Sequence, residues 1–369
     1  VNVPEGHLGG TFVETPARIG PYENNKGELY FIMEPTETDN IFMMVKSTDG
    51  GQSWFEADAE NRPQISDLEG VGSVLSADGI IHIVHEISEA VYHHAFATSG
   101  HSEKKDRWIL DSHLITSIDE PPTQTADITI RPDGSILTVF ASGDMLQYSI
   151  LESNGKWSKA AYLSHKHPAG FSNPSLVCLP DGSVDIAYKS MDGKGWHRQI
   201  LPDNSLTPPQ QFADILGTSE SETIAILPLV YLPGKKMTIA VFRQSDGYLY
   251  LSSKNTGNFW SEPVRVSDRT VVTNAVDSDQ TGADLVAWGD KIILSFISEE
   301  DRDIYLSIIS DLNKTTDARL IVPGIDGSWV RGSILYHQHN SPVYGLIYDA
   351  GSKGGSGYNK YISFNLENE

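Results

Sequence analysis

Short apolar runs alternate along the chain with turns rich in Gly, Asp and Ser, and the runs have the length and alternation of β-strands. The clearest runs each follow or contain a Gly or Asp-Gly turn and read as the second strand of a repeated unit. Seven of them recur at roughly 45- to 55-residue intervals, at 27–34, 79–85, 134–140, 182–188, 237–243, 291–297 and 343–348. No long helical pattern interrupts them, so each unit predicts one antiparallel blade of four strands.

This periodicity predicts an all-β fold, a seven-bladed β-propeller formed by residues 1–369 as a single domain, with six blades as the alternative. The last unit lacks a fourth strand, because the chain ends soon after Tyr361–Leu366. We expect the N-terminal strand, at residues 10–14, to complete that blade and close the ring, since closure removes exposed sheet edges.

The composition and net charge of the chain limit the kinds of partner that we expect it to bind. The chain has 369 residues, of which 39% are hydrophobic and 21% charged, and its net charge is −22. Such a charge disfavours nucleic acid and anionic membranes, so we expect neither as a partner. Cys178 is the only cysteine and cannot form an intrachain disulfide. The chain starts at Val1 without an initiator Met, which favours a processed protein that is secreted or periplasmic. We expect a monomer.

One turn carries a tight motif, Ser-Thr-Asp-Gly-Gly-Gln-Ser-Trp at 47–54. Its glycines supply the positive φ that a tight turn needs, and Trp54 covers the turn with apolar surface. The motif resembles the Asp box, Ser-x-Asp-x-Gly-x-x-Trp, of sialidase-like β-propellers. The resemblance implies the fold, and it places this turn on the rim of the propeller, away from the chemistry.

Arginines occur where the propeller would form its central face. Arg18 and Arg331 lie near the starts of first strands, while Arg243 and Arg302 lie near the ends of second strands. The segment Arg18-Ile-Gly20 resembles the first-blade motif of sialidases, and the segments around Arg243 and Arg302 resemble those that carry their other carboxylate-binding arginines. Guanidinium groups suit bidentate carboxylate binding. These resemblances imply an acidic-sugar site with Arg18, Arg243 and Arg302. We expect Arg331 and Glu222, both near the starts of first strands, to join them as substrate-binding residues.

Arg331 stands about where a sialidase has its tyrosine nucleophile, which disfavours that mechanism. In outline the chain also resembles seven-bladed uronate lyases, such as ulvan lyases and rhamnose-glucuronate lyases. That resemblance implies β-elimination beside a uronic acid, with arginine neutralising the carboxylate and a histidine transferring the proton. His85, at the end of its strand, is the expected proton-transfer residue, with Tyr188 supplementing it. The histidines at positions 82, 93, 94, 165 and 167 are weaker candidates.

Two alternatives stay open. A sialidase-like hydrolase would need two carboxyl groups or an activated tyrosine, and Glu34, Glu86 and Glu222 are available. A non-catalytic carbohydrate-binding propeller would need only the face residues. We expect no cofactor for the chemistry. Structural calcium is possible near Asp277 and Asp279, whereas His82 and His85 point to opposite faces of their strand and do not suit zinc.

Overall fold

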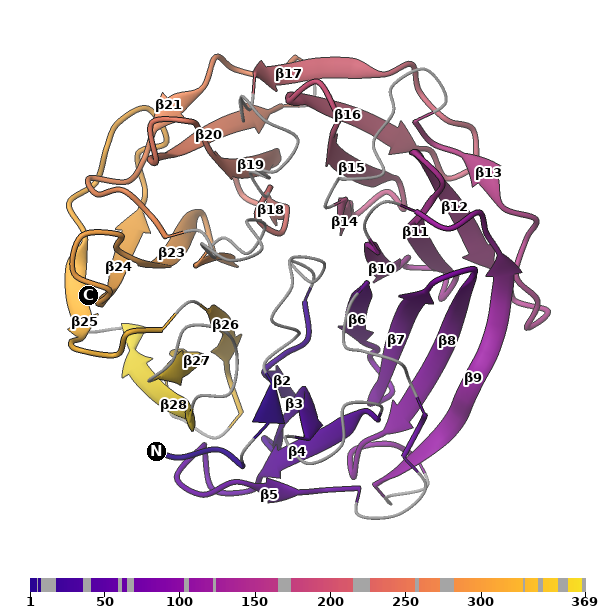
Figure 1. The fold of residues 1–369 in the computed structure, drawn as a ribbon, viewed down its shortest axis with the longest axis horizontal. Coiled ribbons are helices and arrows are strands. Elements are labelled where there is room, and N and C mark those ends of the chain that lie inside the picture. Colours follow the sequence, from indigo (N-terminus) through magenta and orange to yellow (C-terminus); the bar gives the residue numbers. More distant parts are fainter. Residues whose placement is uncertain are drawn as a thin grey trace.

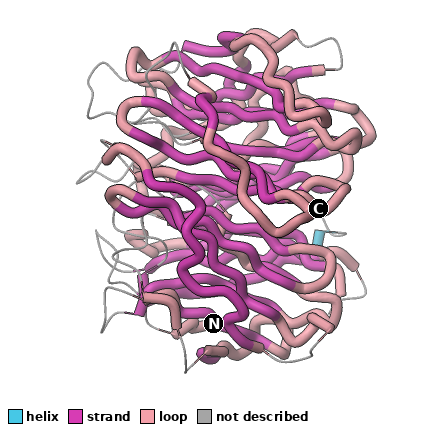
Figure 2. The backbone as a smooth tube through the Cα atoms, turned by 90° about the vertical axis from the view of Figure 1, so that its right-hand side faces the viewer, coloured by secondary structure: helices cyan, strands magenta, loops and turns pink. Residues whose placement is uncertain are grey.

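The computed structural model describes residues 1–4, 6–7, 18–35, 41–58, 62–64, 70–102, 106–121, 124–164, 174–214, 226–255, 259–272, 282–327, 329–337, 341–350 and 358–366. These residues form seven antiparallel sheets arranged as blades around a central channel (Figure 1). The prediction of a seven-bladed all-β propeller is confirmed. Figure 2 shows the blades from the side, with loops and turns at both faces of the ring.

The blades follow the chain in order. Blade 1 contains β1 (Gly6–His7), β2 (Tyr22–Glu23), β3 (Leu29–Pro35), β4 (Met43–Ser47) and β5 (Phe55–Glu56). Blade 2 contains β6 (Val71–Leu75), β7 (Ile80–Ile87), β8 (Ala90–Ala97) and β9 (Arg107–Ser117), and blade 3 contains β10 (Ala126–Ile130), β11 (Ile136–Ser142), β12 (Met145–Leu151) and β13 (Ala161–Tyr162). Blade 4 contains β14 (Ser175–Cys178), β15 (Val184–Lys189), β16 (Lys194–Ile200) and β17 (Gln210–Asp214).

The remaining blades have the same order. Blade 5 contains β18 (Val230–Leu232), β19 (Met237–Arg243), β20 (Leu249–Lys254) and β21 (Val264–Arg265). Blade 6 contains β22 (Ala283–Trp288), β23 (Lys291–Ile297), β24 (Ile304–Ile309) and β25 (Arg319–Val322), and blade 7 contains β26 (Val330–Leu335), β27 (Val343–Ala350) and β28 (Tyr358–Asn365). In Figure 1 the first strands β6, β10, β14, β18 and β26 are the innermost strands of their blades and lie around the channel.

The second strands are buried along their length because both faces of each blade pack against neighbouring blades. Every residue of β11 and of β27 is buried. The apolar clusters accordingly span blade interfaces, as where Leu137 and Val139 of blade 3 pack with Ile186 and Tyr188 of blade 4. Side chains on these strands therefore point at neighbouring blades rather than into the channel, which matters for the site below.

The N-terminus closes the ring. Val1 and Tyr361 exchange two backbone hydrogen bonds, Val3 N donates to Asn359 O at 2.9 Å, and Asn2 bridges to Lys360. Residues 1–3 thus add the fourth strand to blade 7. Closure by the N-terminal segment is confirmed, but it uses these residues, while the expected strand at 10–14 lies outside the described residues.

The Asp-box turn connects β4 to β5 on the outer part of blade 1. Ser47 Oγ accepts from Gly51 N at 2.8 Å, Asp49 Oδ1 accepts from Ser53 N at 2.8 Å, and Trp54 Nε1 donates to Gly51 O at 3.2 Å. Gly51 has φ +88°, and a Cβ there would lie 2.0 Å from the Tyr361 ring. The turn is therefore a structural contact with blade 7, remote from the channel.

Removal of residues 1–3 tests the closure. The deletion removes the backbone bonds to β28 and exposes its edge, so the free energy of unfolding should fall by about 2 to 4 kcal/mol, with some self-association through the edge. Urea unfolding and size-exclusion chromatography measure both. A deleted protein that is as stable and as monodisperse as the full chain would show that closure lies elsewhere.

Candidate functional site

A cavity of about 380 Å³ lies in the central channel, lined by the inner strands of blades 4 to 7 and by the segment that enters blade 1. Arg18 and Arg331 both line it, together with Asp284, Tyr22 and Tyr231. We call it the central pocket. Two of the four predicted arginines therefore meet there, brought by blades 1 and 7, which are neighbours in the closed ring.

The polar residues of the channel share one register position on the inner strands. Asp127, Ser175, Asp284 and Arg331 lie opposite Val139, Ala187, Ser295 and Ile347, each of which precedes a buried aromatic residue on its second strand. At this position the acidic side chains bond to the next blade. Asp127 Oδ2 accepts from Leu176 N at 2.8 Å, and Asp284 Oδ2 accepts from Gly332 N at 2.7 Å. The backbone geometry thus fixes both carboxylates at the channel.

Burial and opposite charges set the electrostatics of the pocket. Burial raises the pKa of Asp127 to about 6, although Arg18 favours its ionised form. Burial also raises the pKa of Asp284, against the charges of Arg331 and Arg18. For Arg331, burial lowers the pKa to about 10 while Asp284 opposes that change. Arg18 acts electrostatically on both carboxylates, and both gain protons more readily than ordinary aspartates.

The two arginines are held differently. Arg331 is 4% exposed, donates from Nη1 to Val330 O at 2.8 Å, and stacks its guanidinium 3.8 Å from the centroid of the Trp329 ring. Arg18 is partly exposed, and in the described residues its one hydrogen bond runs from Nη2 to Leu229 O, at 2.5 Å. Most of the five guanidinium donors of Arg18 therefore have no protein acceptor there. Arg18 is the side chain best placed to bind a ligand oxygen.

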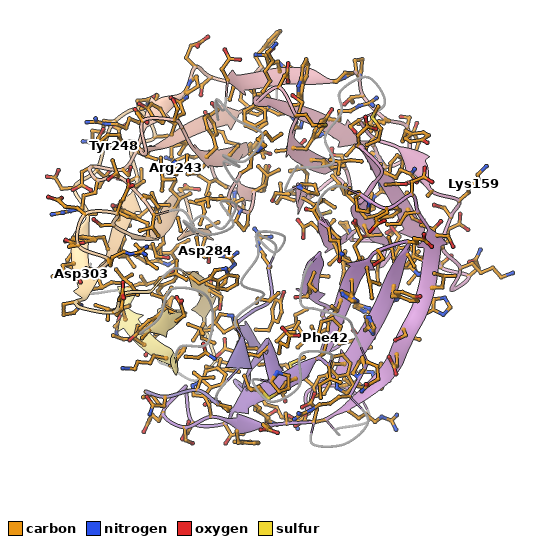
Figure 3. The ribbon with its side chains drawn as sticks, in the orientation of Figure 1. Phe42, Lys159, Arg243, Tyr248, Asp284 and Asp303 are labelled. Atoms are coloured by element: carbon orange, nitrogen blue, oxygen red, sulfur yellow. The ribbon has the colours of Figure 1, made fainter. Side chains whose placement is uncertain are left out.

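Arg243 and Arg302, the other two predicted arginines, do not line the central pocket. Arg243 Nε donates to Val271 O at 2.9 Å, and its Nη2 lies 3.9 Å from Glu299 Oε2. Figure 3 shows Arg243 farther from the channel than Asp284. Arg302 lies on a turn with φ +60°, and its Nε is 3.7 Å from Asp326 Oδ1. Both therefore make contacts within blades 5 to 7. Glu222, His165 and His167 lie outside the described residues.

His85 and Tyr188, the predicted proton-transfer residues, are buried between blades. His85 is 1% exposed, and its ring meets the Phe42 ring edge-on at 5.5 Å in blade 1. Tyr188 is fully buried, occupies the register of Phe140 and Phe296, and burial raises its pKa to about 12. Neither side chain lines the central pocket. The strands that carry His85 and Tyr188 end at the face of the propeller where the site was expected, but the side chains at these strand ends point at the neighbouring blade.

Three further histidines of blade 2 are neutral: His93 and His94 are buried and His82 is half-buried, whereas His113 on β9 is exposed. His82 Nδ1 and His93 Nε2 lie 3.1 Å apart, so one ring donates to the other. His94 Nδ1 accepts from Ser112 N at 3.1 Å. Burial lowers the pKa of His82 to about 4 and of His93 to about 3, and places that of His94 well below its usual range. These rings pack the blade and offer no exposed base.

Sequence reasoning missed Asp284, which lines the central pocket, and Asp127, which acts electrostatically on Arg18 from the same register position of another inner strand. A signal was present, because Ala126-Asp127 and Ala283-Asp284 both precede an apolar residue at the start of an inner strand. A repeated acidic residue in an otherwise apolar position indicates a fixed polar role. Tyr22, whose Oη lies 2.8 Å from Ser73 O, and Tyr231 were also missed.

Across the described ranges, no group of three or more His, Cys, Asp or Glu side chains is arranged to hold a metal ion. Asp277 and Asp279, the suggested calcium ligands, lie outside those ranges. No described helix is long and apolar enough to cross a membrane.

Comparison with solved structures finds other propellers. The chain is similar to the BP39L lectin from Burkholderia pseudomallei, with a TM-score of 0.69 and 12% identity over 94% of this chain and 97% of that one. It is also similar to the fucose-specific lectin from Aleuria aurantia, with a TM-score of 0.52 and 13% identity over 80% and 91% of the two chains. BBS1N, solved in complex with ARL6DN, gives a TM-score of 0.52 and 11% identity over 100% and 99%.

Identities this low show the β-propeller fold alone. No protein-family model and no curated protein matches the sequence. Membership of the sialidase-like or uronate-lyase families therefore stays a prediction, and function has to be argued from the pocket itself.

The lowered pKa values of these blade 2 histidines predict that the folded protein loses stability at acidic pH. In the unfolded chain they titrate near 6.5, whereas the folded protein keeps His82 neutral down to about pH 4. Their contribution to the free energy of unfolding is therefore complete above about pH 6.5, where they are neutral in both states. As the pH falls towards their pKa values in the folded protein, the unfolded chain binds protons that the folded protein does not, and this contribution is lost, by up to about 3 kcal/mol for His82. Urea unfolding, measured over about three pH units from about pH 7.5 to 4.5, should show a free energy of unfolding that falls with decreasing pH. His82→Gln should make this dependence weaker. His337→Gln, at an exposed position, is the control. Equal slopes in all three proteins would contradict the prediction.

Proposed function

We propose that this propeller is a carbohydrate-binding protein that takes a carboxylate-bearing sugar, such as a uronic acid unit, in its central pocket. The observation that carries the proposal is Arg18, whose guanidinium faces the pocket with a single hydrogen bond to protein in the described residues. Arg331 adds a second, fixed positive charge from the neighbouring blade. A carboxylate bound to Arg18 would gain charge-assisted hydrogen bonds in a partly desolvated site.

The size and walls of the pocket suit a sugar ring. Its volume of about 380 Å³ falls within the range of roughly 300 to 1,000 Å³ usual for small-molecule sites. Tyr22 and Tyr231 supply aromatic surface, and Asp284 and Ser333 supply polar groups at the wall. Lectins among the structural neighbours support carbohydrate binding as a use of this fold, although each neighbour's own ligand belongs to that neighbour.

Binding explains the pocket better than elimination does. A lyase needs a base within reach of the C5 proton, and His85, the residue predicted for that task, is buried against Phe42 instead. Incubation with uronate-containing glycans, followed by the ultraviolet absorbance of a 4,5-unsaturated uronate, distinguishes the two readings. We expect binding without formation of that product.

Substitution of Arg18 tests the site. Methyl β-D-glucuronide should bind to the wild-type protein, and Arg18→Met should weaken it at least about tenfold, the effect of losing one charge-assisted hydrogen bond. Isothermal titration calorimetry measures the affinity. Reaction of Cys178, which lines the same pocket, with a thiol reagent gives a second readout, because bound sugar should slow it.

Arg302→Met is the matched control, since it removes an arginine that does not line the pocket. It should leave both the affinity and the protection of Cys178 unchanged. If Arg302→Met weakens binding and Arg18→Met does not, the carboxylate lies at the position expected from the sequence and the central-pocket proposal is wrong.

The acidic residues predict how affinity depends on pH. Asp127, with a pKa of about 6, is ionised at pH 7.5 and repels a bound carboxylate, whereas at pH 5.5 it is largely protonated. Affinity for methyl β-D-glucuronide should therefore rise at least about threefold as the pH falls from about 7.5 to 5.5, while the sugar acid stays ionised.

Asp127→Asn should remove this dependence and bind tightly at both pH values, because the amide carries no titrating charge. Its oxygen can still accept from Leu176 N, although the second acceptor, which now takes the hydrogen of Ile128 N, is lost. Methyl β-D-glucoside, which lacks the carboxylate, provides the ligand control. Affinity that falls with decreasing pH in the wild-type protein would contradict the assigned role of Asp127.

A further inference from the structure

A second cavity, of about 410 Å³, opens between blades 4 and 5. Its walls include Leu179, Pro180 and Asp181, from the turn that joins β14 to β15, and Lys254 and Asn255, at the end of β20. In an antiparallel blade, the turns after first and third strands lie at the face opposite the entry to the inner strands. This blade 4–5 pocket therefore opens on the face away from the loops that enter the inner strands.

Asp185 forms the floor of the blade 4–5 pocket and is fully buried. Its Oδ1 accepts from Lys254 Nζ at 2.6 Å, from Gln199 Nε2 at 3.0 Å and from His197 Nε2 at 2.9 Å, while Thr238 donates to Oδ2. Burial opposes ionisation, but His197 and Lys254 hold the pKa of Asp185 at about 2. The carboxylate is thus saturated with donors and takes no ligand itself.

Lys254 is not saturated. Its side chain is 4% exposed, and in the described residues its ammonium group makes one hydrogen bond, to Asp185. An ammonium has three donors, so two of them point at no protein acceptor there. Gln199 likewise uses its Nε2, towards Asp185 and Ser183, while its Oε1 has no hydrogen bond among those residues.

Lys46 of blade 1 shows what a purely structural buried lysine looks like in this fold. Its side chain is 6% exposed, and Nζ contacts Glu28 Oε1 at 3.1 Å, Asp106 Oδ2 at 2.8 Å and Ser99 Oγ at 3.0 Å. All three donors have protein partners. Unsatisfied buried donors cost stability, so the contrast indicates that the pocket beside Lys254 is built to hold a polar group.

We propose that the blade 4–5 pocket binds a neutral sugar unit through two adjacent hydroxyl groups. One hydroxyl would accept from Lys254 Nζ and the other would donate to Gln199 Oε1. Tyr231, with Leu179 and Pro180, would contact the C–H face of the ring. This site shares Tyr231 with the central pocket, but its hydrogen-bonding groups, Lys254 and Gln199, do not line that pocket, so the proposal does not depend on the function of the central pocket.

Charge balance favours a neutral ligand. On the floor, the charge of Lys254 is matched by Asp185. At the rim, Lys236 is matched by Asp181, and both are exposed. The pocket therefore carries no net formal charge from these four residues, whereas two arginines and one aspartate line the central pocket and leave it one positive charge.

Ligand-observed NMR tests the proposal with the methyl glycosides of glucose, galactose, mannose, xylose, fucose and rhamnose. At least one should show saturation transfer from the wild-type protein, and Lys254→Met should weaken it at least about tenfold. Lys46→Met is the matched control, a buried lysine outside the pocket, and should leave binding unchanged. Arg18→Met should also leave it unchanged, because it alters only the central pocket.

Lys254→Met leaves Asp185 with fewer donors and could unfold the interface. Leu179→Trp therefore provides a second test, since it fills the pocket without removing a hydrogen-bonding side chain. It should abolish the signal while preserving the unfolding transition. The proposal is overturned if no glycoside in the panel binds at tens of millimolar, if Leu179→Trp binds like the wild type, or if the signal is lost in Arg18→Met.

Discussion

The inner strands of neighbouring blades lie side by side around the channel in separate sheets, without a hydrogen-bonded ladder between them, and the ring depends on how their backbone groups are satisfied. Leu176 N, Leu229 N and Gly332 N each find a side-chain acceptor on the preceding blade, from Asp127, Ser175 and Asp284. A buried N–H without a partner would cost about 1 to 3 kcal/mol. Short acidic or hydroxyl side chains meet this need on the inner strands of blades 3, 4 and 6.

That requirement shapes the central pocket. Two of the three acceptors are carboxylates, and a carboxylate buried beside the channel needs positive charge nearby. Arg18 acts electrostatically on both, and Arg331 on Asp284. The first role of the arginines is thus to stabilise the buried carboxylates of the closed ring. Because Arg18 makes a single hydrogen bond to protein in the described residues, the same group that balances the ring can also bind an anion.

The spacing of turns and apolar strands was enough to predict seven blades, because each blade repeats one strand pattern. It also predicted Arg18 and Arg331 near the entries to inner strands, and both line the central pocket. It misplaced His85 and Tyr188, because a strand that ends at the channel face still directs its side chains at the neighbouring blades, as Phe140 and Phe296 do in the same register. Asp127 and Asp284 were missed because their role, accepting one backbone hydrogen from the next blade, appears only when blades are placed side by side.

The same reasoning separates structural from ligand-binding polar groups elsewhere in the ring. Asp185 and Lys46 are both buried and charged, but each has protein partners for its full hydrogen-bonding capacity. Lys254 and Arg18 hold their place through one bond each and line a cavity with their remaining donors. The blades repeat one pattern of strands. A buried polar side chain whose hydrogen-bonding groups are only partly used at one blade interface is therefore a property of the residues at that interface and not of the repeated fold. In a fold that many functions share, such departures are the physical evidence that can locate a site.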